Sequence, residues 1–404
     1  MLQHVCWEKC QGVNWALGSA ADVPVKNNAK FAADMSKRLF RLNNYENFVF
    51  SPVSLEILLA MVLEGSDGNT DAQIRKHIFQ CEDSDRYCVG NYIFSLSNAW
   101  RGFTSDFVHM KFAPVLAVNE NFAVKDQFKQ RIGLIPSAQF LQVDFAKKRN
   151  AVAYEIDEIV ARKTAYRVKN SIPPGSLKAS TDMVLVNALY LNASFYEPFY
   201  EIKEGQFFEP GAALFHNVEF LHGEFHDIFY HERGPFSMIG VPLSEGSISL
   251  YVAMQKNNYR INVADIIRRT LAGEIEFEQK TVDVKLPKFT MEYTIQDVIE
   301  HVKSLNVTDM FDKSTANFGH LLQNPWDKVV VSDIHHKAYF EVTKNGIDDR
   351  AAPTIDGVFH MLDPATANFH ANSPFAFFIT MKHGTATRKF ESVLFAGQYS
   401  RPPQ

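Results

Sequence analysis

A nearly continuous apolar run at residues 183–191, MVLVNALYL, constrains the fold more than any other part of the sequence. The run is shorter than the roughly 18 to 20 apolar residues that a membrane-spanning helix needs, and strands buried on both faces have this pattern. We therefore expect it to be a central strand of a sheet. Alternating or β-rich stretches predict further strands at residues 248–254, 282–286, 329–342, 375–381 and 393–397.

Helical patterns come mainly before these strands. Apolar residues recur at helical spacing from Phe31 to Leu42, and Pro52 begins a strongly apolar helix. Residues 151–169 carry a further helical pattern, with charged positions on one side and apolar positions on the other. No repeat or low-complexity linker divides the 404 residues. The sequence therefore predicts one α+β unit with its helices concentrated early.

Charge and motifs exclude several classes of function. The net charge is −5 and basic clusters such as Lys147-Lys148-Arg149 are short, so neither nucleic acid nor a membrane is expected as a partner. The chain has no Gly-x-Ser-x-Gly elbow, no phosphate-binding glycine loop, no dinucleotide fingerprint and no His-Glu-x-x-His helix. We therefore expect a protein that is not an enzyme and needs no cofactor.

Histidines give the nearest approach to a metal site, at His222, His226 and the nearby His231. Two histidines four apart can share a zinc ion on a helix, but the surrounding glycine and aromatic residues favour a strand or a loop. On a strand the two would lie about 13 Å apart, so we expect no metal there. His336 shares a strand face with Ile334 and other apolar residues, which predicts a buried histidine that needs hydrogen-bond partners.

Cysteines and glycosylation sequons bear on the cellular compartment. Cys6 with Cys10 and Cys81 with Cys88 form close pairs, which fit small disulfide loops and buried reduced thiols equally well. Asn192-Ala-Ser and Asn306-Val-Thr are sequons, so Asn192 and Asn306 are glycosylation candidates. No signal peptide is visible in the chain, because its first residues lack an uninterrupted apolar region. The sequons nonetheless favour an extracellular, secreted glycoprotein.

Six motifs in order resemble one family, the serpins. They are NFVFSPVSL at 47–55, GNTDAQI at 68–74, LVNALYL at 185–191, PF at 198–199, VKLPKF at 284–289 and NSPFAFFI at 372–379. The resemblance runs from about residue 28 to residue 402. It implies a serpin fold of helices plus three β-sheets, with an exposed reactive-centre loop at about 344–370. It also implies an N-terminal extension at 1–27 and a single domain at 28–404.

The resemblance assigns roles to two sets of residues. Ser51, Ser54, Asn187 and His336 correspond to the shutter, the polar cluster beneath the main sheet that loosens when the sheet opens. The hinge begins the reactive-centre loop, which in family inhibitors is cleaved by a protease and then inserts as a new central strand. The hinge residues are Lys344, Gly346, Ile347, Asp348, Asp349, Arg350 and Pro353.

The segment that contains the hinge is predicted from its residues to be an exposed loop. Asn345-Gly346 is a turn signal, the acidic and basic residues that follow favour water, and Pro353 cannot donate to a sheet ladder. Family inhibitors carry an acidic residue, glycine, Thr or Ser and then small residues here, whereas this chain has Lys344, Gly346, Ile347 and two aspartates.

Insertion of such a hinge would be costly. Family geometry would bury Ile347, Asp349, Ala351 and Pro353. An unpaired carboxylate at Asp349 would cost several kcal/mol there unless it is protonated or paired with Arg350. Since about 1.4 kcal/mol on a barrier changes a rate tenfold, the loop should be cleaved as a substrate without efficient insertion. We therefore expect a non-inhibitory serpin that acts by binding a partner or a ligand.

The alternative is a suicide-substrate inhibitor of a chymotrypsin-like serine protease or a cysteine protease. Family spacing then places the scissile bond near Phe359, His360 or Met361. Two further departures from the family, Phe195 in place of a tryptophan and Tyr166 in place of a glycine, favour the non-inhibitory interpretation or reflect local repacking.

The partner is not specified by the sequence. A protease that cleaves the loop, an unidentified protein and a small ligand are all compatible with it, and we expect a monomer. The 34 phenylalanines fit core packing better than a ligand pocket.

Overall fold

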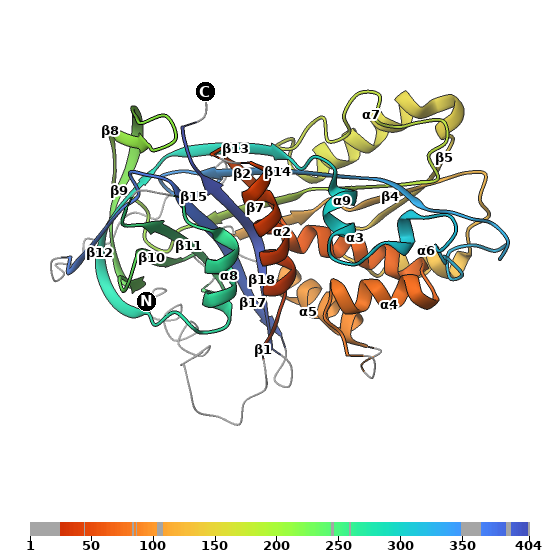
Figure 1. Ribbon diagram of the computed structural model, residues 1–404, viewed down its shortest axis with the longest axis horizontal. Coiled ribbons are helices and arrows are strands. Elements are labelled where there is room, and N and C mark those ends of the chain that lie inside the picture. The colour runs from red at the N-terminus through yellow and green to blue at the C-terminus, as the bar shows by residue number, and fades with distance from the viewer. Residues whose placement is uncertain are drawn as a thin grey trace.

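The computed structural model describes residues 25–43, 45–82, 85, 87–102, 108–243, 246–257, 260–348, 365–384 and 389–402. The predicted α+β class is confirmed, with most helices preceding the long strands (Figure 1). The helices are α2 (Ala29–Leu42), α3 (Pro52–Gly65), α4 (Gly68–His77), α5 (Cys88–Gly102), α6 (Asp126–Ile132), α7 (Phe145–Lys163), α8 (Val263–Leu271) and α9 (Val298–Lys303), with a 3-10 turn η1 (Asp309–Phe311).

The larger sheet has ten strands among the described residues, in the order β1-β18-β17-β11-β10-β9-β12-β16, with β2 added on β18 and β8 on β9. Its strands are β1 (Val25–Asn27), β2 (Phe48–Phe50), β8 (Glu201–Glu209), β9 (Leu214–His231), β10 (Phe236–Pro242), β11 (Ile248–Gln255), β12 (Glu278–Pro287), β16 (Ala367–His370), β17 (Phe375–Gly384) and β18 (Lys389–Tyr399). Strand β1 begins three residues before the expected domain boundary and pairs in parallel with β18.

A second sheet has eight strands among the described residues, in the order β3-β7-β15-β14-β6-β4-β5, with β13 added on β14. Its strands are β3 (Val108–Phe112), β4 (Val115–Asn119), β5 (Gln139–Val143), β6 (Met183–Asn187), β7 (Leu189–Ser194), β13 (Phe289–Thr294), β14 (Val331–Val342) and β15 (Gly346–Ile347). The predicted central strand is thus confirmed as β6 and β7, which are buried along their whole length.

Two hydrogen-bonded sheets replace the three that the family resemblance implied, because β9 is shared. The first half of β9 pairs with β8, and its last residues pair with β10. Two of the expected sheets are therefore joined through β9 into one continuous hydrogen-bonded sheet in the described part of the chain.

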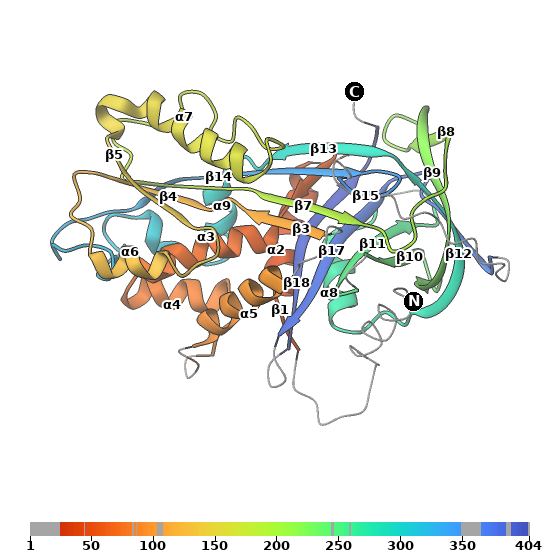
Figure 2. The ribbon, with the colours of Figure 1, turned by 180° about the vertical axis from the view of Figure 1, so that it is seen from behind.

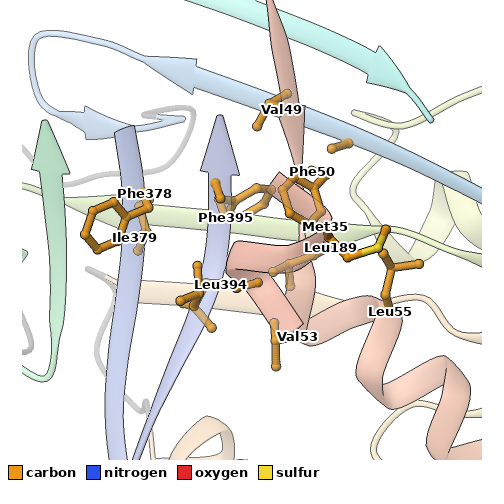
Figure 3. Packing of buried hydrophobic residues seen from close by; sticks show 14 of the residues in the cluster. Met35, Val49, Phe50, Val53, Leu55, Leu189, Phe378, Ile379, Leu394 and Phe395 are labelled. Atoms are coloured by element: carbon orange, nitrogen blue, oxygen red, sulfur yellow. The ribbon is translucent and has the colours of Figure 1, made fainter. Parts of the chain in front are cut away.

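The main core lies between α3 and the two sheets. Ser51 caps α3 and Pro52 occupies its first turn, where a missing amide hydrogen costs nothing. Nearly every residue of α3 is buried, and Figure 3 shows Val53 and Leu55 packing near Phe50, Leu189 and residues of β18. A helix that is apolar on all sides needs such enclosure.

A smaller core lies on the other face of the eight-stranded sheet, beneath α7. Figures 1 and 2 both show α7 on one side of β14 and β4, with α3 on the other. Phe145, Val152, Ile156 and Val160 of α7 pack there against alternate residues of the sheet, such as Val184. The two faces of this sheet therefore have separate apolar clusters.

A chain of buried polar residues joins α3, α5 and the β17–β18 pair. Tyr92 donates to Glu56 Oε2 at 2.8 Å and contacts Ser392 Oγ at 3.0 Å. The two ring nitrogens of His383 lie 2.8 Å from Ser392 Oγ and 2.9 Å from Ser95 Oγ. Burial raises the pKa of Glu56 to about 8 and lowers the pKa of His383 to about 3, so both are neutral at pH 7.

One of the two predicted cysteine pairs is a disulfide. Cys81, after α4, is bonded to Cys88 at the start of α5, whereas Cys6 and Cys10 lie outside the described residues.

Replacing Cys81 and Cys88 together by serine is expected to reduce the free energy of unfolding by roughly 2 to 3 kcal/mol. The chain-entropy model gives this value for a loop of about eight residues. Urea denaturation of the oxidised protein and the double variant measures the difference. Equal midpoints would show that this bond contributes nothing to stability.

No helix in the described ranges is long and apolar enough to cross a membrane.

Candidate functional site at the hinge of the eight-stranded sheet

A tight turn joins β14 to β15 and reverses the chain. Thr343 N donates to Gly346 O at 2.9 Å, and Gly346 N donates to Thr343 Oγ1 at 3.3 Å. The turn is also tied to the chain after β7, because Phe195 N donates to Asn345 O at 2.8 Å and Phe199 N donates to Lys344 O at 3.0 Å. The start of the hinge is thereby directed back into the sheet.

Strand β15 lies between β14 and β7. Gly346 pairs with Ser194 and Ile347 with Ala193, while Ile347 also faces Val342 of β14. Lower in the sheet, β6 pairs directly with β14. The prediction of an exposed loop is therefore wrong for residues 346–348, which are buried. It failed because a turn followed by polar residues was taken as a sign of solvent exposure.

Gly346 is required by the close approach of β7. A Cβ atom at this position would lie 2.2 Å from Ala193 O and 2.7 Å from Ser194 Cα, both backbone atoms that cannot move aside. The family glycine retained here thus fits a steric need of the inserted hinge.

Ile347 and Asp348 point to opposite faces of the sheet. Ile347 is 2 % exposed and belongs to the main core, as the family geometry implied. Asp348 is 1 % exposed and has a left-handed backbone with φ 48°. Aspartate tolerates this conformation, but an extended strand cannot continue through it. Strand β15 therefore ends where Asp348 begins.

Asp348 is paired with Arg167 in what we call the hinge cluster, formed by Arg167, Asp348, Glu341 and Tyr339. Arg167 donates to both carboxylate oxygens of Asp348, with Nε at 2.5 Å from Oδ2. Arg167 also lies 3.2 Å from the Glu341 carboxylate and donates to the Tyr339 hydroxyl at 3.1 Å. The Tyr339 hydroxyl in turn donates to Glu341 at 2.9 Å.

This bidentate pair supplies a buried hinge carboxylate, Asp348, with a cation that the sequence reasoning did not consider; the expected pairing of Asp349 with Arg350 lies outside the described residues. A guanidinium that donates two parallel hydrogen bonds to a carboxylate makes one of the strong, geometrically specific pairings in proteins. The seated aspartate is thus compensated by a residue that lies 181 positions earlier in the chain.

The chain after α7 positions Arg167. Ala165 and Tyr166 both have left-handed backbones, with φ 52° and φ 60°, and Tyr166 N donates to Ala161 O. This conformation fits the glycine that the family resemblance implied at the position of Tyr166, since other residues are strained there by about 1 kcal/mol or more. The strained turn brings Arg167 from the end of α7 back over β14.

Further insertion would have to break this arrangement. Asp348 would have to become extended and, by strand alternation, Asp349 would follow Ile347 toward the main core. Asp349, Arg350 and Pro353, and the scissile-bond candidates Phe359, His360 and Met361, lie outside the described residues.

The four shutter candidates lie together at the start of α3. Ser51 N donates to His336 Nε2 at 3.1 Å, Asn187 Nδ2 donates to Ser54 O, and His336 pairs with Asn187 across the ladder. All four are fully buried, and burial lowers the pKa of His336 to about 3. The prediction of a buried histidine with a hydrogen-bond partner is confirmed, although its Nδ1 atom has none.

The histidines of β9 form no metal site. His222 and His226 lie on a strand, as expected, and His226 Nδ1 is 3.2 Å from the Glu197 carboxylate. Among the residues that the structure describes, no group of three or more His, Cys, Asp or Glu side chains is arranged to hold a metal ion.

The glycosylation candidates have opposite environments. Asn192 is 1 % exposed in the middle of β7, so its side chain has no room for a glycan and the prediction is wrong at this position. Asn306 is exposed. The sequon pattern alone carries no information on burial, although the surrounding apolar run indicated a central strand.

Arg167, Tyr339 and Glu341 were missed by the sequence reasoning. One signal was present, because Tyr339 and Glu341 alternate with buried residues of a predicted strand and so share its other face. Nothing local to Arg167 indicated that the loop after α7 would reach the hinge.

Comparisons with known proteins agree in sequence and in fold. The family model Serpin (serine protease inhibitor) matches residues 26–402. Serpin B3 of Homo sapiens is 25 % identical over 398 residues, which cover 93 % of this chain and 98 % of that protein. Neuroserpin of Homo sapiens is 26 % identical over 400 residues, which cover 96 % of this chain and 94 % of that protein.

Solved structures show the same fold at lower identity. Uncleaved ovalbumin has a TM-score of 0.78 at 20 % identity, with coverage of 94 % of this chain and 100 % of that one. Human thyroxine-binding globulin in complex with thyroxine has a TM-score of 0.77 at 20 % identity, with coverage of 93 % and 98 %.

Proposed function

The chain belongs to the serpin family, and we propose that it acts in this family as a non-inhibitory member whose loop is cleaved as a substrate without efficient insertion. The observation that carries the proposal is the end of β15 at Asp348, which is left-handed, buried and paired with Arg167. Continued insertion must extend this residue and then bring a second aspartate toward the core. Each step slows insertion relative to hydrolysis of the acyl-enzyme, which releases the protease.

The role that remains is binding. Some proteins of this fold bind a small ligand, as the structure of human thyroxine-binding globulin in complex with thyroxine illustrates. We propose that this chain binds a protein partner or a small ligand and has no catalytic function. The Cys81–Cys88 disulfide supports an oxidising, extracellular location, because such bonds form and persist mainly there.

Incubation with a chymotrypsin-like protease tests the proposal. We expect cleavage of the loop with no denaturation-resistant covalent complex on a gel, and the same melting temperature to within a few degrees before and after cleavage. A covalent complex together with a large rise in melting temperature would instead establish inhibition.

A variant of the hinge should change this outcome. In this variant Ile347 is replaced by Thr, and Asp349 and Pro353 by Ala. The changes remove an apolar side chain larger than the family's Thr or Ser, the second aspartate, and a residue that cannot donate a hydrogen bond to a neighbouring strand. We expect cleavage to raise the melting temperature of this variant more than that of the unaltered protein, by roughly 1 °C for each kcal/mol of insertion cost removed. No rise would place the barrier to insertion outside these three positions.

A further inference from the structure

The sequon at Asn306 lies in an exposed, hydrogen-bonded turn. Asn306 follows α9 and has φ 65°, a left-handed conformation that asparagine tolerates well. Its backbone N donates to Lys303 O at 2.9 Å, which closes the turn. The next residue, Val307, is fully buried and anchors the turn to the core. The asparagine side chain is thereby left at the surface.

Helix α4 holds the rest of the sequon in place. Gln73 Oε1 accepts hydrogen bonds from Thr308 N at 2.9 Å and from Asp309 N at 3.0 Å. Gln73 Nε2 donates to Asp309 Oδ1 at 2.8 Å, and Asn69 Nδ2 donates to Asp309 Oδ2 at 2.6 Å. The sequon is therefore fixed relative to one face of α4.

An open groove of about 470 Å³ lies between this turn and α4. Asn306 and Thr308 form one wall, and the other is formed by Asn69, Ala72, Gln73, Lys76 and His77. Most of these side chains are hydrogen-bond donors or acceptors, which suit the hydroxyl and acetamido groups of a sugar better than an apolar ligand. Asn306 is thus one of the residues that line the groove.

We propose that Asn306 is an N-glycosylation site and that the first N-acetylglucosamine residues of its glycan lie in this groove against α4, whereas Asn192 is unmodified in the folded protein. In this reaction Nδ2 of Asn306 forms a bond to the anomeric carbon of a lipid-linked oligosaccharide diphosphate. The bond from that carbon to the diphosphate breaks, the lipid diphosphate leaves, and the amide loses one proton. The proposal rests on the secretory route proposed above but not on the behaviour of the hinge.

The first test uses the full chain secreted from eukaryotic cells behind an added signal peptide. We expect its intact mass to fall on treatment with peptide N-glycosidase. Treatment in ¹⁸O water should place the heavy oxygen at residue 306 and not at residue 192. Secreted protein without a mass change, or with the label at residue 192, would overturn the proposal.

Matched variants distinguish the loss of the glycan acceptor from a disturbance of the turn. Asn306→Gly keeps a residue suited to the left-handed conformation and removes the acceptor, and Thr308→Ala keeps Asn306 but breaks the sequon. Both should abolish the mass change completely, whereas Asn192→Gln should leave it intact. A mass change that persists in Asn306→Gly contradicts the assignment.

The position of the glycan is tested by amine labelling. Lys76 lies in the groove and is exposed, and Lys37 on α2 is an exposed control. An amine-reactive reagent should modify Lys76 several-fold more slowly in the glycosylated protein than after deglycosylation, with Lys37 unchanged. Equal rates at Lys76 would show that the glycan points away from the groove. Protease assays on unglycosylated protein test the hinge separately, so failure of one proposal leaves the other standing.

Discussion

Replacing Arg167 by alanine is expected to drive residues 346–348 out of the sheet. The variant leaves the Asp348 carboxylate, whose side chain is 2 % exposed, without its bidentate partner. A buried charge stripped of its partner costs roughly 3 to 5 kcal/mol, so the seated hinge loses at least about a hundredfold in population relative to the released hinge. Hydrogen exchange at Gly346 and Ile347 should accelerate by the same factor, and the loop should be cleaved faster by proteases.

Two further variants make this result specific. Arg162→Ala removes an exposed arginine of α7 and should leave exchange at the hinge unchanged. Adding Asp348→Asn to Arg167→Ala removes the unpaired charge while keeping a residue that tolerates the left-handed backbone, and should restore most of the protection. Unchanged exchange in the Arg167→Ala protein would mean that the ion pair does not hold the hinge.

Glu56→Gln is expected to stabilise the protein at pH 8.5 by several kcal/mol. Burial raises the pKa of Glu56 from an ordinary value of 4.5 to about 8, so the unfolded chain releases this proton well before the folded chain does. The stability contributed by this group is therefore complete below pH 4.5, falls as the pH rises from 4.5 to 8, and is lost above 8. At 1.36 kcal/mol per pKa unit, the loss has a ceiling of about 5 kcal/mol.

Urea denaturation at pH 5 and at pH 8.5 measures this effect. Glutamine cannot ionise, and its Oε1 atom can still accept from Asn28 and from Tyr92, which both donate to Glu56 Oε2 at 2.8 Å. The gain in the free energy of unfolding should be several kcal/mol at pH 8.5 and less than about 1 kcal/mol at pH 5. Glu155→Gln on the exposed face of α7 is the matched control. A gain independent of pH would show that Glu56 is not protonated in the folded protein.

The sequence predicted the elements of the fold well where apolar patterns were long. The run at 183–191, the β-rich stretch at 329–342 and the strongly apolar helix after Pro52 all lie where they were expected, as β6 with β7, β14 and α3. Their burial on both faces, or on all sides, leaves little freedom in how such segments fold. Motif resemblance then supplied the family and the positions of the shutter residues.

The hinge could be predicted only in part. The composition of the hinge indicated that insertion of the loop into the sheet would be unfavourable. The burial of Ile347 was expected from family geometry. Asp348 is buried next to Arg167, which pairs with its carboxylate. Two residues with left-handed backbones after α7 bring Arg167 to this position. Neither the strained turn nor a contact across 181 residues has a local sequence signal, so the polar residues were interpreted as solvent-exposed.

The ion pair between Arg167, which follows α7, and Asp348 of the hinge also couples the motion of this segment to the motion of the loop. For the loop to advance through the sheet, Asp348 must become extended and separate from Arg167, and for the loop to leave, Arg167 must give up the same carboxylate partner. Because one side chain belongs to both motions, neither the helix nor the loop can fluctuate widely alone. We expect the two to behave as a single cooperative unit, with one opening free energy and one activation barrier.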